Sequence, residues 1–477
     1  MQDLSFLNNS NSKPIILFQL DILKVNVQWI NVSPGIWFVN FENDYPLVDD
    51  ELLSGFSNQY TTFGDVGSIM IDSLLQIKVY DLLELANTEE SFYYDDNNNL
   101  YVHVIDNDDP AIHNIFIGII NGFSYKDFTP LNSNTFYEGR IKEIPSIRKE
   151  RDYLFFGKLK YSTGSVKLIN SDGYFDSFAE DNNVYGNAAR LFIGTEDMDI
   201  SDYVQLSSLI VDTVSVREKI FNVNLKDSRT NLSKKILYSC TDTNALTAIE
   251  EILFNAYNFR VTSVYYDLTI WNASKLLAPN ITIDISEEGD ETEVIDLIEN
   301  ICNSCFGFFD ISPEGKFTFK FIDTTATSQS VIFYKDFFNE KEITYDPSEI
   351  LTSVVIGYDK NWTDNEYTYF TDDTREYDIF LKYKTYISKT FDTYINNDVA
   401  KATSLASKIM NYTEDVHGLI EADLPLSYAG LDIGDMVDIE TNFSQTRKIL
   451  STKKAEVIGK NMNFNNRKIN IKFRITE

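Results

Sequence analysis

The sequence predicts a mainly β, multi-domain protein with one α+β module. Aromatic and β-branched residues, among them 28 Tyr and 34 Phe, occur in short runs that Asn, Asp, Gly and Ser interrupt, which is typical of strands and turns. Helical periodicity is concentrated between residues 240 and 330 and recurs once near residue 400. A chain of 477 residues is long enough for three or four domains. We therefore divide it into four regions: 1–136, 137–239, 240–330 and 331–477.

The first region, residues 1–136, is expected to be β-rich. Polar and apolar residues alternate in LDILKVNVQWI (20–30), which predicts a strand with one exposed face. Two aromatic arms surround an Asp-Asn tip at 92–105, which predicts a hairpin. The segment IHNIFIGIINGFSY (112–125) predicts one or two buried strands.

The second region, residues 137–239, contains the clearest turn signal. The alternating residues 165–169 predict a strand that ends at Asn170, Ser171, Asp172 and Gly173. Gly173 would supply the positive φ that such a turn requires. The aromatic residues that follow, Tyr174, Phe175 and Phe178, are expected to return to the core.

The third region, residues 240–330, predicts two helices and a hairpin. Leu246, Ile249 and Leu253 form one helical stripe, with Thr241 or Thr243 as the expected cap. A second helix is expected over 291–305, with an apolar face made of Val294, Leu297, Ile298, Ile301, Cys302 and Cys305. The segment 306–322 then predicts a hairpin with a Pro-Glu-Gly turn.

The fourth region, residues 331–477, is expected to be β with one helix. Ala402, Leu405, Ile409 and Tyr412 share one side of a helix predicted over 399–412, which Asn397 or Asp398 would cap. A strand interrupted by Gly434 and Asp435 follows, and then a hairpin that turns on Asn465 and Asn466.

The charge excludes several classes of partner. The chain carries 41 Lys and Arg against 73 Asp and Glu, a net charge of −32. A sequence-independent nucleic-acid binder or a protein that docks on anionic lipid needs a basic face, so both classes are disfavoured. Three Cys are too few for a disulfide framework. We see no signal peptide and no membrane span, and we expect a soluble protein made in a cytoplasm.

Three segments, in this order, resemble phage tail hub or baseplate hub proteins. The first motif is GSVKLINSDGYFD (164–176), followed by RLFIG (190–194). The second motif is the predicted helix 291–305 running into FDISPEGKFTF (309–319). The third motif, LDIGDMVDI (431–439), follows a predicted helix. The resemblance covers roughly residues 140–477, and its structural-motif residues are Gly164, Asn170, Asp172, Gly173, Gly434 and Asp435.

This resemblance implies a scaffold rather than an enzyme. Hub proteins form a trimeric ring between the tail tube and the central spike or tip, with two β-barrel-like, tube-type domains per subunit. Residues 137–239 would form one such domain and 331–477 would contribute the other. Expected partners are copies of this chain, tail tube and spike proteins, and other baseplate proteins, within a virion tail. DNA would pass through without specific binding, and the acidity suits such a lumen, although solubility explains it equally well.

No catalytic, cofactor-binding or metal-binding residues are predicted. Cys302 and Cys305 lie on one apolar helix face, so we expect buried thiols rather than a zinc or redox site. The acidic cluster 106–109 lacks the Gly and Glu spacing of a calcium loop and is expected to be a solvated turn. Three His, and no nucleophile or P-loop motif, make enzymatic activity improbable.

Two other functions remain open. A tip protein that binds the host surface would present an aromatic groove, which we expect in residues 1–135, and would bind a sugar. Its best anchors are Trp29, Trp37, Trp271 and Trp362, although a core or subunit-contact role is the stronger interpretation of each. A cell-wall hydrolase would need a pair of carboxylates in a cleft, and no pair among the 73 acidic residues stands out.

Overall fold

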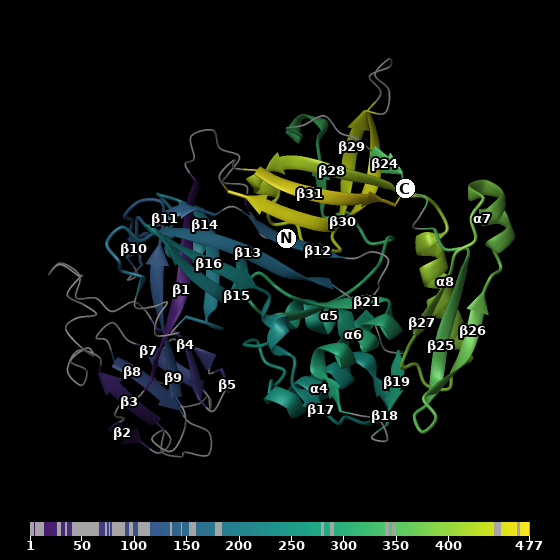
Figure 1. Cartoon of the computed structure of the whole chain (residues 1–477), viewed down its shortest axis with the longest axis horizontal. Coiled ribbons are helices and arrows are strands. Elements are labelled where there is room, and N and C mark those ends of the chain that lie inside the picture. Colours follow the sequence, from purple (N-terminus) through teal and green to yellow (C-terminus); the bar gives the residue numbers. More distant parts are fainter. Residues whose placement is uncertain are drawn as a thin grey trace. The chain divides into compact units, whose positions relative to one another are not determined.

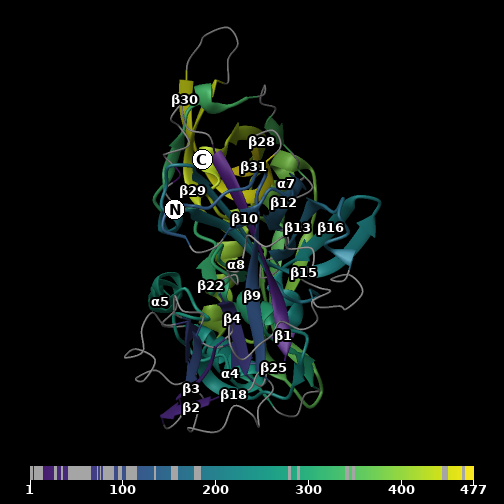
Figure 2. The same ribbon diagram turned by 90° about the vertical axis from the view of Figure 1, so that its left-hand side faces the viewer.

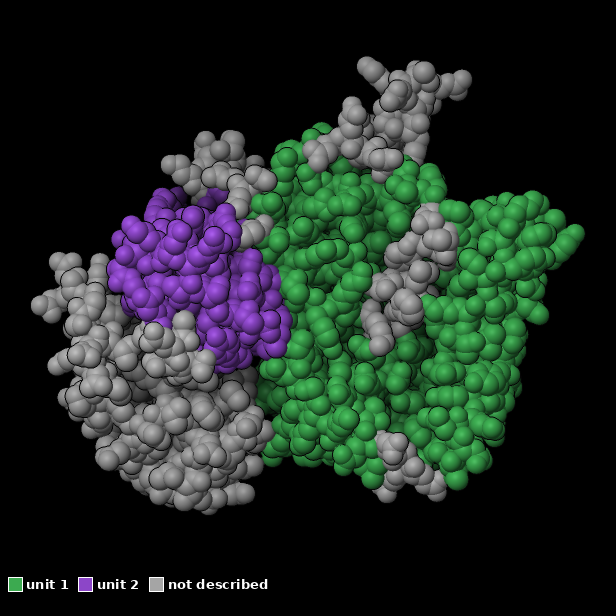
Figure 3. All heavy atoms as spheres, in the orientation of Figure 1, with its two compact units in different colours: residues 1–8, 146–163, 227–477 green, residues 9–145, 164–226 purple. Residues whose placement is uncertain are grey.

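The fold is that of a computed structural model. It describes residues 4, 14–25, 30–33, 36–40, 66–71, 74–75, 77–78, 91–94, 99–103, 115–133, 136–144, 146–151, 159–176, 184–277, 281–286, 291–338, 343–345, 347, 350–442, 450–464 and 468–476. The chain divides into two compact units, which Figure 3 colours green and purple. Unit 1 contains residues 1–8, 146–163 and 227–477, and unit 2 contains residues 9–145 and 164–226. The predicted division into four domains has different boundaries, since residues 137–239 contribute to both units, and it stays a prediction.

Unit 2 is built around one antiparallel sheet. Its strands include β1 (Pro14–Val25), β4 (Val66–Ile71), β9 (Ile115–Phe123), β14 (Ala188–Thr195), β15 (Val204–Arg217) and β16 (Ile220–Lys226). β1 lies between β9 and β14, and the order continues through β15 to β16 (Figures 1 and 2). Short strands join this sheet: β5 (Leu74–Leu75), β10 (Tyr137–Glu138), β11 (Ile141–Glu143) and the end of β13 (Leu159–Ile169).

A second, smaller sheet in unit 2 contains the hairpin that the sequence predicts at 92–105. Its order is β2 (Ile30–Ser33), β3 (Ile36–Asn40), β8 (Asn99–His103), β7 (Ser91–Tyr94) and β6 (Ile77–Lys78). β7 and β8 pair antiparallel, which confirms the hairpin. Its tip, and the acidic cluster 106–109, lie outside the described residues.

The core of unit 2 brings the predicted turn against the sheet. Phe175, which follows that turn, stacks on Phe221 of β16 with ring centroids 4.6 Å apart. It also packs against Phe123 of β9, with ring centroids 5.5 Å apart. All three rings are fully buried, so Phe175 returns to the core as predicted. Tyr174 is only partly buried, and Phe178 lies outside the described residues.

Unit 1 contains the α+β module. Its helices are α4 (Ala245–Tyr257), α5 (Leu268–Leu277) and α6 (Val294–Cys305). Its strands are β17 (Lys235–Ile236), β18 (Cys240–Asn244), β19 (Thr282–Ile285), β20 (Thr292–Glu293), β21 (Gly307–Ile311) and β22 (Phe317–Phe321). The six residues predicted for the apolar face of α6 are all buried. The β21–β22 hairpin is confirmed, with Gly315 at φ +86° in its turn.

Two details of this module differ from the prediction. The cap of α4 is Asn244, whose Oδ1 accepts hydrogen bonds from the backbone of Leu246 and Thr247, and the expected Thr241 or Thr243 cap is wrong. An Asn carboxamide is as good a cap as a Thr hydroxyl, and here it stands at the boundary of the helix. Helix α5 was not predicted, because its sequence LTIWNASKLL mixes β-branched and aromatic residues with small polar ones.

The rest of unit 1 is a mostly antiparallel set of strands and a helix-covered ribbon. The set contains β12 (Ile147–Arg151), β23 (Ser330–Ile332), β24 (Ile343–Tyr345), β28 (Gly418–Pro425), β29 (Met436–Asn442), β30 (Leu450–Asn463) and β31 (Lys468–Ile475). Within it, β23 pairs parallel with β29. The ribbon has the order β26 (Glu366–Asp372), β25 (Ser353–Asn361) and β27 (Ser388–Asp392), and α8 (Val399–Thr413) packs on it. Asp398 caps α8, as predicted. Helix α7 (Glu376–Tyr383) was not predicted.

Strand β30 organises that set of strands. One of its edges pairs with β31, and the other pairs with β29 and, further along, with β12. The segment 146–151 is thereby fixed in unit 1 although most of its sequence neighbours belong to unit 2. Short 3-10 turns occur at Ile200–Asp202, Ser228–Asn231, Tyr334–Asp336 and Leu426–Tyr428.

The prediction of a mainly β fold with an α+β module is confirmed. The barrel-like form of two domains stays a prediction. Among the described residues, none of the helices combines the length and the apolar character that a membrane crossing needs.

Candidate functional site

The first motif forms a tight, internally bonded turn in unit 2. Asn170 is buried, and its Oδ1 accepts the backbone N–H of Phe175 at 2.8 Å while its Nδ2 donates to Asp176 at 2.7 Å. Gly173 has φ +75°, as the sequence predicts. Asn170 therefore acts as an internal brace of the turn. Gly164, the first residue of the motif, lies within β13 and takes no part in the turn.

Asp172 faces outward and pairs with an arginine from the β10–β11 connection. Arg140 donates to its two carboxylate oxygens at 3.0 and 2.8 Å, and the same guanidinium lies 4.5 Å from the centre of the Tyr174 ring. The hydrogen bonds from Arg140 lower the pKa of Asp172. Because the Asp172 side chain is 53% exposed, this pair positions the turn and adds little to stability.

The third motif turns sharply in unit 1 and docks on β30. The backbone N–H of Gly434 donates to Val457 at 2.8 Å, and the Val457 N–H donates to the carbonyl of Asp435 at 2.9 Å. The Asp435 carboxylate accepts the backbone N–H of Asp432 at 2.8 Å. Gly434 has φ +83°, and a Cβ there would lie 3.0 Å from the Phe308 ring of β21. The glycine thus permits both the turn and its close contact with the second motif.

Replacing Gly434 with Ala should destabilise unit 1 by about 2–3 kcal/mol, because the new methyl group adds a contact with Phe308 to the cost of a positive φ. Gly186→Ala is the matched control, since Gly186 has φ +77° and nothing within 4 Å of a Cβ. Urea unfolding of both variants separates the two effects. Equal losses of stability would show that the contact with Phe308 does not matter.

A buried network of alternating charges joins the second and third motifs. Lys149 of β12 contacts Asp310 of β21 at 2.5 Å and Asp432 of the third motif at 2.9 Å. Lys320 of β22 contacts Asp432 at 3.3 Å and Asp435 at 3.4 Å, and it donates to the Ile433 carbonyl at 2.9 Å. Asp310 is fully buried. Together with Lys460, described below, these side chains form what we call the lysine–aspartate network: Lys149, Lys320, Lys460, Asp310, Asp432 and Asp435.

Lys460 completes this network from β30. Its ammonium donates to the carbonyls of Ala429 at 2.5 Å and Leu431 at 3.0 Å, and burial lowers its pKa to about 8. Burial alone would raise the pKa of Asp432, but Lys149 and Lys320 hold it well below its ordinary value. Three lysines and three aspartates therefore balance in the interior, where a lone charge would be costly.

A second ionic cluster lies deeper in unit 1. Arg151 of β12 contacts Glu456 of β30 at 2.8 Å and donates to the Tyr412 hydroxyl at 2.7 Å. That hydroxyl donates in turn to Glu456 at 2.8 Å. The guanidinium of Arg474 lies 3.4 Å from the centre of the Tyr412 ring and donates to the Tyr412 carbonyl. We call these four side chains the arginine–glutamate cluster.

His417 adjoins this cluster and gives it a pH dependence. Its two ring nitrogens lie 2.8 Å from the Ile475 carbonyl and 3.2 Å from the Tyr412 carbonyl. Burial and the nearby Arg474 lower its pKa from 6.5 to about 4. Between these values the unfolded chain binds a proton that the folded chain does not, so stability falls as the pH is lowered from 6.5 to 4.

The His417→Gln variant should lose this slope. We expect the wild-type chain to lose up to about 3 kcal/mol through His417 over that interval, and the variant to lose correspondingly less. Urea unfolding at pH 7 and pH 4.5 measures the difference. The same pH slope in both proteins would contradict the assignment.

The ionic groups of both clusters hold strands together and are at most about one fifth exposed, so their arrangement suits a structural role. Cys302 and Cys305 are buried free thiols, as predicted, and burial raises the pKa of both. Across the described ranges, no group of three or more His, Cys, Asp or Glu side chains is arranged to hold a metal ion.

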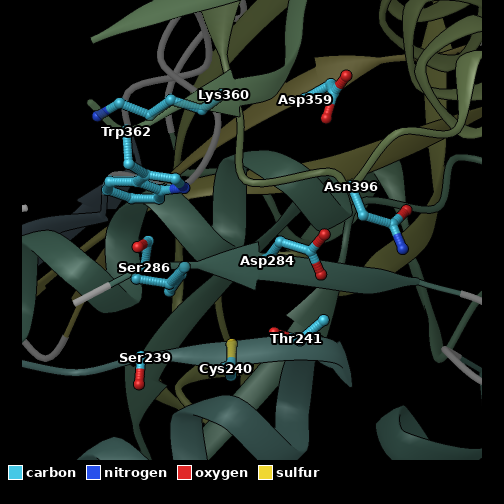
Figure 4. Close-up of a pocket in the computed structure, with 10 residues that line it drawn as sticks. Ser239, Cys240, Thr241, Asp284, Ser286, Asp359, Lys360, Trp362 and Asn396 are labelled. Carbon is cyan, nitrogen blue, oxygen red and sulfur yellow. The ribbon is translucent and has the colours of Figure 1, made fainter. Parts of the chain in front are cut away.

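A polar pocket of about 570 Å³ opens elsewhere in unit 1. Asp359, Lys360 and Trp362, from β25 and the turn after it, form one side (Figure 4). Asp284 and Ser286, at the end of β19, face them, and Cys240 of β18 lies beneath. The remaining lining residues are Ser239, Thr241, Ile285 and Asn396.

The four tryptophans lie in different environments. Trp271 is fully buried in the α+β core, which confirms a core role. Trp362 packs against the edge of that core and also lines the pocket. Trp29 and the side chain of Trp37 lie outside the described residues, so the groove expected in 1–135 stays a prediction.

Neither the two ionic clusters nor the pocket was predicted from the sequence. The one available signal was Asp310, a carboxylate in the otherwise apolar strand GFFDI, all five residues of which are buried. A buried carboxylate in such a strand requires a cationic partner. That partner, Lys149, is distant in sequence and looks like any other exposed lysine.

No family model matches the sequence, and no curated protein matches it. Solved structures do match. Phage and prophage tail proteins are among them.

Three tail proteins illustrate the similarity. A tail protein from Neisseria meningitidis is 10% identical with a TM-score of 0.44, over 70% of this chain and 94% of that one. The 43 kDa tail protein of prophage MuSo2 from Shewanella oneidensis is 10% identical with a TM-score of 0.40, over 72% and 95%. A prophage tail protein from Listeria monocytogenes is 10% identical with a TM-score of 0.41, over 72% and 91%.

Proposed function

We propose that this chain is a structural component of a phage or phage-like tail tip or baseplate. In this proposal it forms a hub ring that joins the tail tube to the central tip or spike and leaves a channel for DNA. The observation that carries the proposal is the convergence of the second and third motifs. Asp310 and Lys320 of the second motif's hairpin and Asp432 and Asp435 of the third motif belong to one buried network.

The local structure of each motif supports the same proposal. The first motif is a strand that ends in a turn at Gly173, the second is a helix followed by a hairpin, and the third is a turn at Gly434 followed by a strand. These are the forms that the resemblance to hub proteins implies. A scaffold that bears load also benefits from interior ion pairs that fix strand register.

The charge is consistent with a DNA channel. A net charge of −32 disfavours the capture of a polyanion, so an acidic wall would let DNA slide. Expected partners are further copies of this chain, in a trimer, together with tail tube, central spike or tip and other baseplate proteins. The location would be the tail of the virion.

We propose no enzymatic activity. The carboxylates of the lysine–aspartate network are occupied by lysines, and Glu456 is occupied by Arg151 and Tyr412. Groups held in this way are poorly placed to exchange protons with a substrate.

The assembly state tests this proposal. Light scattering on the purified chain should give a mass three times that of the 54.8 kDa chain, either alone or, after mixing with candidate tail tube and spike proteins, within the complex that forms. Negative-stain images should show a ring with a central opening. A monomer under every one of these conditions would refute the hub ring.

A further inference from the structure

The pocket in unit 1 contains polar groups whose hydrogen-bonding capacity the described residues do not fill. The Asp284 carboxylate accepts the backbone N–H of Asp242 through one oxygen at 2.6 Å, and its other oxygen has no hydrogen bond within the described part of the chain. The side chains of Asp359 and Lys360 likewise form no hydrogen bond or ion pair among the described residues. Two carboxylates and one ammonium group thus belong to residues that line the same pocket.

The pocket is also held rigidly. Asp359 has φ +49°, an unusual conformation for a residue with a side chain, and its backbone N–H is fixed to the Ile395 carbonyl at 2.9 Å. Asn396 donates to Asp242 at 3.0 Å and to Thr282 at 3.1 Å. Backbone strain and preorganised polar groups of this kind are typical of binding sites.

Trp362 adds an aromatic wall. Its ring lies 5.5 Å from the Tyr394 ring, which belongs to the core, and the Lys360 ammonium lies 4.1 Å from its centre. The same ammonium is 5.4 Å from the Tyr367 ring. Apolar ring surface therefore adjoins hydrogen-bonding groups within one pocket (Figure 4).

The charges and ligands available exclude several classes of occupant. Asp284 and Asp359 would repel an anion, as would the net charge of −32. A bound divalent cation needs more oxygen ligands than these two carboxylates provide, and the described residues hold no cluster of three. A wholly apolar ligand would leave the carboxylates and the ammonium without partners.

We propose that this pocket binds a neutral saccharide. Trp362 would contact the C–H face or edge of a sugar ring, Asp284 and Asp359 would accept hydrogen bonds from its hydroxyls, and Lys360 would donate to one of them. The volume of about 570 Å³ is within the range of small-molecule sites and is large enough for a mono- or disaccharide. This function goes beyond the scaffold role proposed above, because a hub needs no such pocket, and it places sugar binding in unit 1.

Saturation-transfer NMR and calorimetry on the full chain test this proposal. The probes are glucose, galactose, rhamnose, N-acetylglucosamine and the β-1,4-linked dimers of glucose and N-acetylglucosamine. We expect saturable binding of at least one probe, with a Kd between about 10 μM and 10 mM, and at least a tenfold loss of affinity in both Trp362→Ala and Asp284→Asn. Asp359→Asn should have a similar effect, and because this side chain has no protein partner the variant should fold normally.

The control is Tyr377→Ala, which removes an exposed aromatic side chain from α7, outside the pocket, and should leave binding unchanged. Thermal unfolding shows which variants are folded. The proposal is overturned if no probe binds the wild-type chain, or if the folded pocket variants bind as the wild type does. It is also overturned if calcium chloride binds at the aspartates while every sugar fails to bind.

Discussion

Replacing Asp432 with Asn should lower the free energy of unfolding of unit 1 by about 3 kcal/mol. Asp432 lies between Lys149 at 2.9 Å and Lys320 at 3.3 Å, and its side chain is only 19% exposed. Removal of its charge leaves three interior lysines with two aspartates. Breaking a buried pair from one side typically costs about 3–5 kcal/mol, and the lower end applies here because Asp310 and Asp435 remain.

The matched control for this variant is Asp415→Asn. Asp415 pairs with Lys382 at the surface, where the two side chains are 51% and 58% exposed. Such a pair contributes at most about 1 kcal/mol. Urea unfolding of the two variants should therefore differ by at least about 2 kcal/mol. If Asp432→Asn is no more costly than Asp415→Asn, the lysine–aspartate network does not hold the second and third motifs together.

Replacing Glu456 with Gln should be the most damaging single change that we predict, with a loss of about 3–5 kcal/mol. The variant leaves Arg151 as a buried guanidinium group without its carboxylate, in a cluster that also contains the buried Arg474. In both arginines, Nε and Nη1 are already buried without a hydrogen-bond partner. Neither guanidinium can therefore compensate for the lost carboxylate charge with new hydrogen bonds.

Glu421→Gln on the neighbouring strand β28 is the control, because Glu421 is exposed and should lose less than about 0.5 kcal/mol. The double variant Arg151→Met/Glu456→Met should cost less than the two single variants together, since the two side chains share one contact. Additive losses would show that Arg151 and Glu456 act independently.

Local sequence patterns were sufficient to predict much of the fold. The apolar stripe of α6, the cap and stripe of α8, and the β21–β22 hairpin depend on residues within about one or two turns of each other, so their spacing is visible in the chain. The turns at Gly173 and Gly434 were visible for the same reason. Helix α7 was not, because its eight residues, EYDIFLKY, are too few for a clear period and include two tyrosines and a phenylalanine.

The ionic clusters could not be predicted, because their members meet only through the fold. Lys149 and Asp432 are 283 residues apart, and Arg151 and Tyr412 are 261 apart. Both pairs depend on β12 lying along β30, an arrangement that no local pattern specifies. The pocket has the same origin, since β18, β19 and the turn after β25 form it together.

In the proposed tail role, the two ionic clusters would maintain the register of the strands. If the second and third motifs form the framework of a hub, the strands that carry them must keep their register when the ring is loaded. Interior ion pairs with fixed partners are more specific than apolar contacts, although they contribute less to stability. The large effects expected for Asp432→Asn and Glu456→Gln test this framework without reference to the assembled particle.

Location in the particle tests the central claim most directly. Gold-labelled antibodies raised against the purified chain should be applied to tailed particles from the organism that carries the gene, and the label scored by electron microscopy. A tail or baseplate hub predicts label at one end of the tail, at the tip, and none on the head. Particles that carry no label, or label confined to the head, would contradict the assignment of this chain to the tail tip.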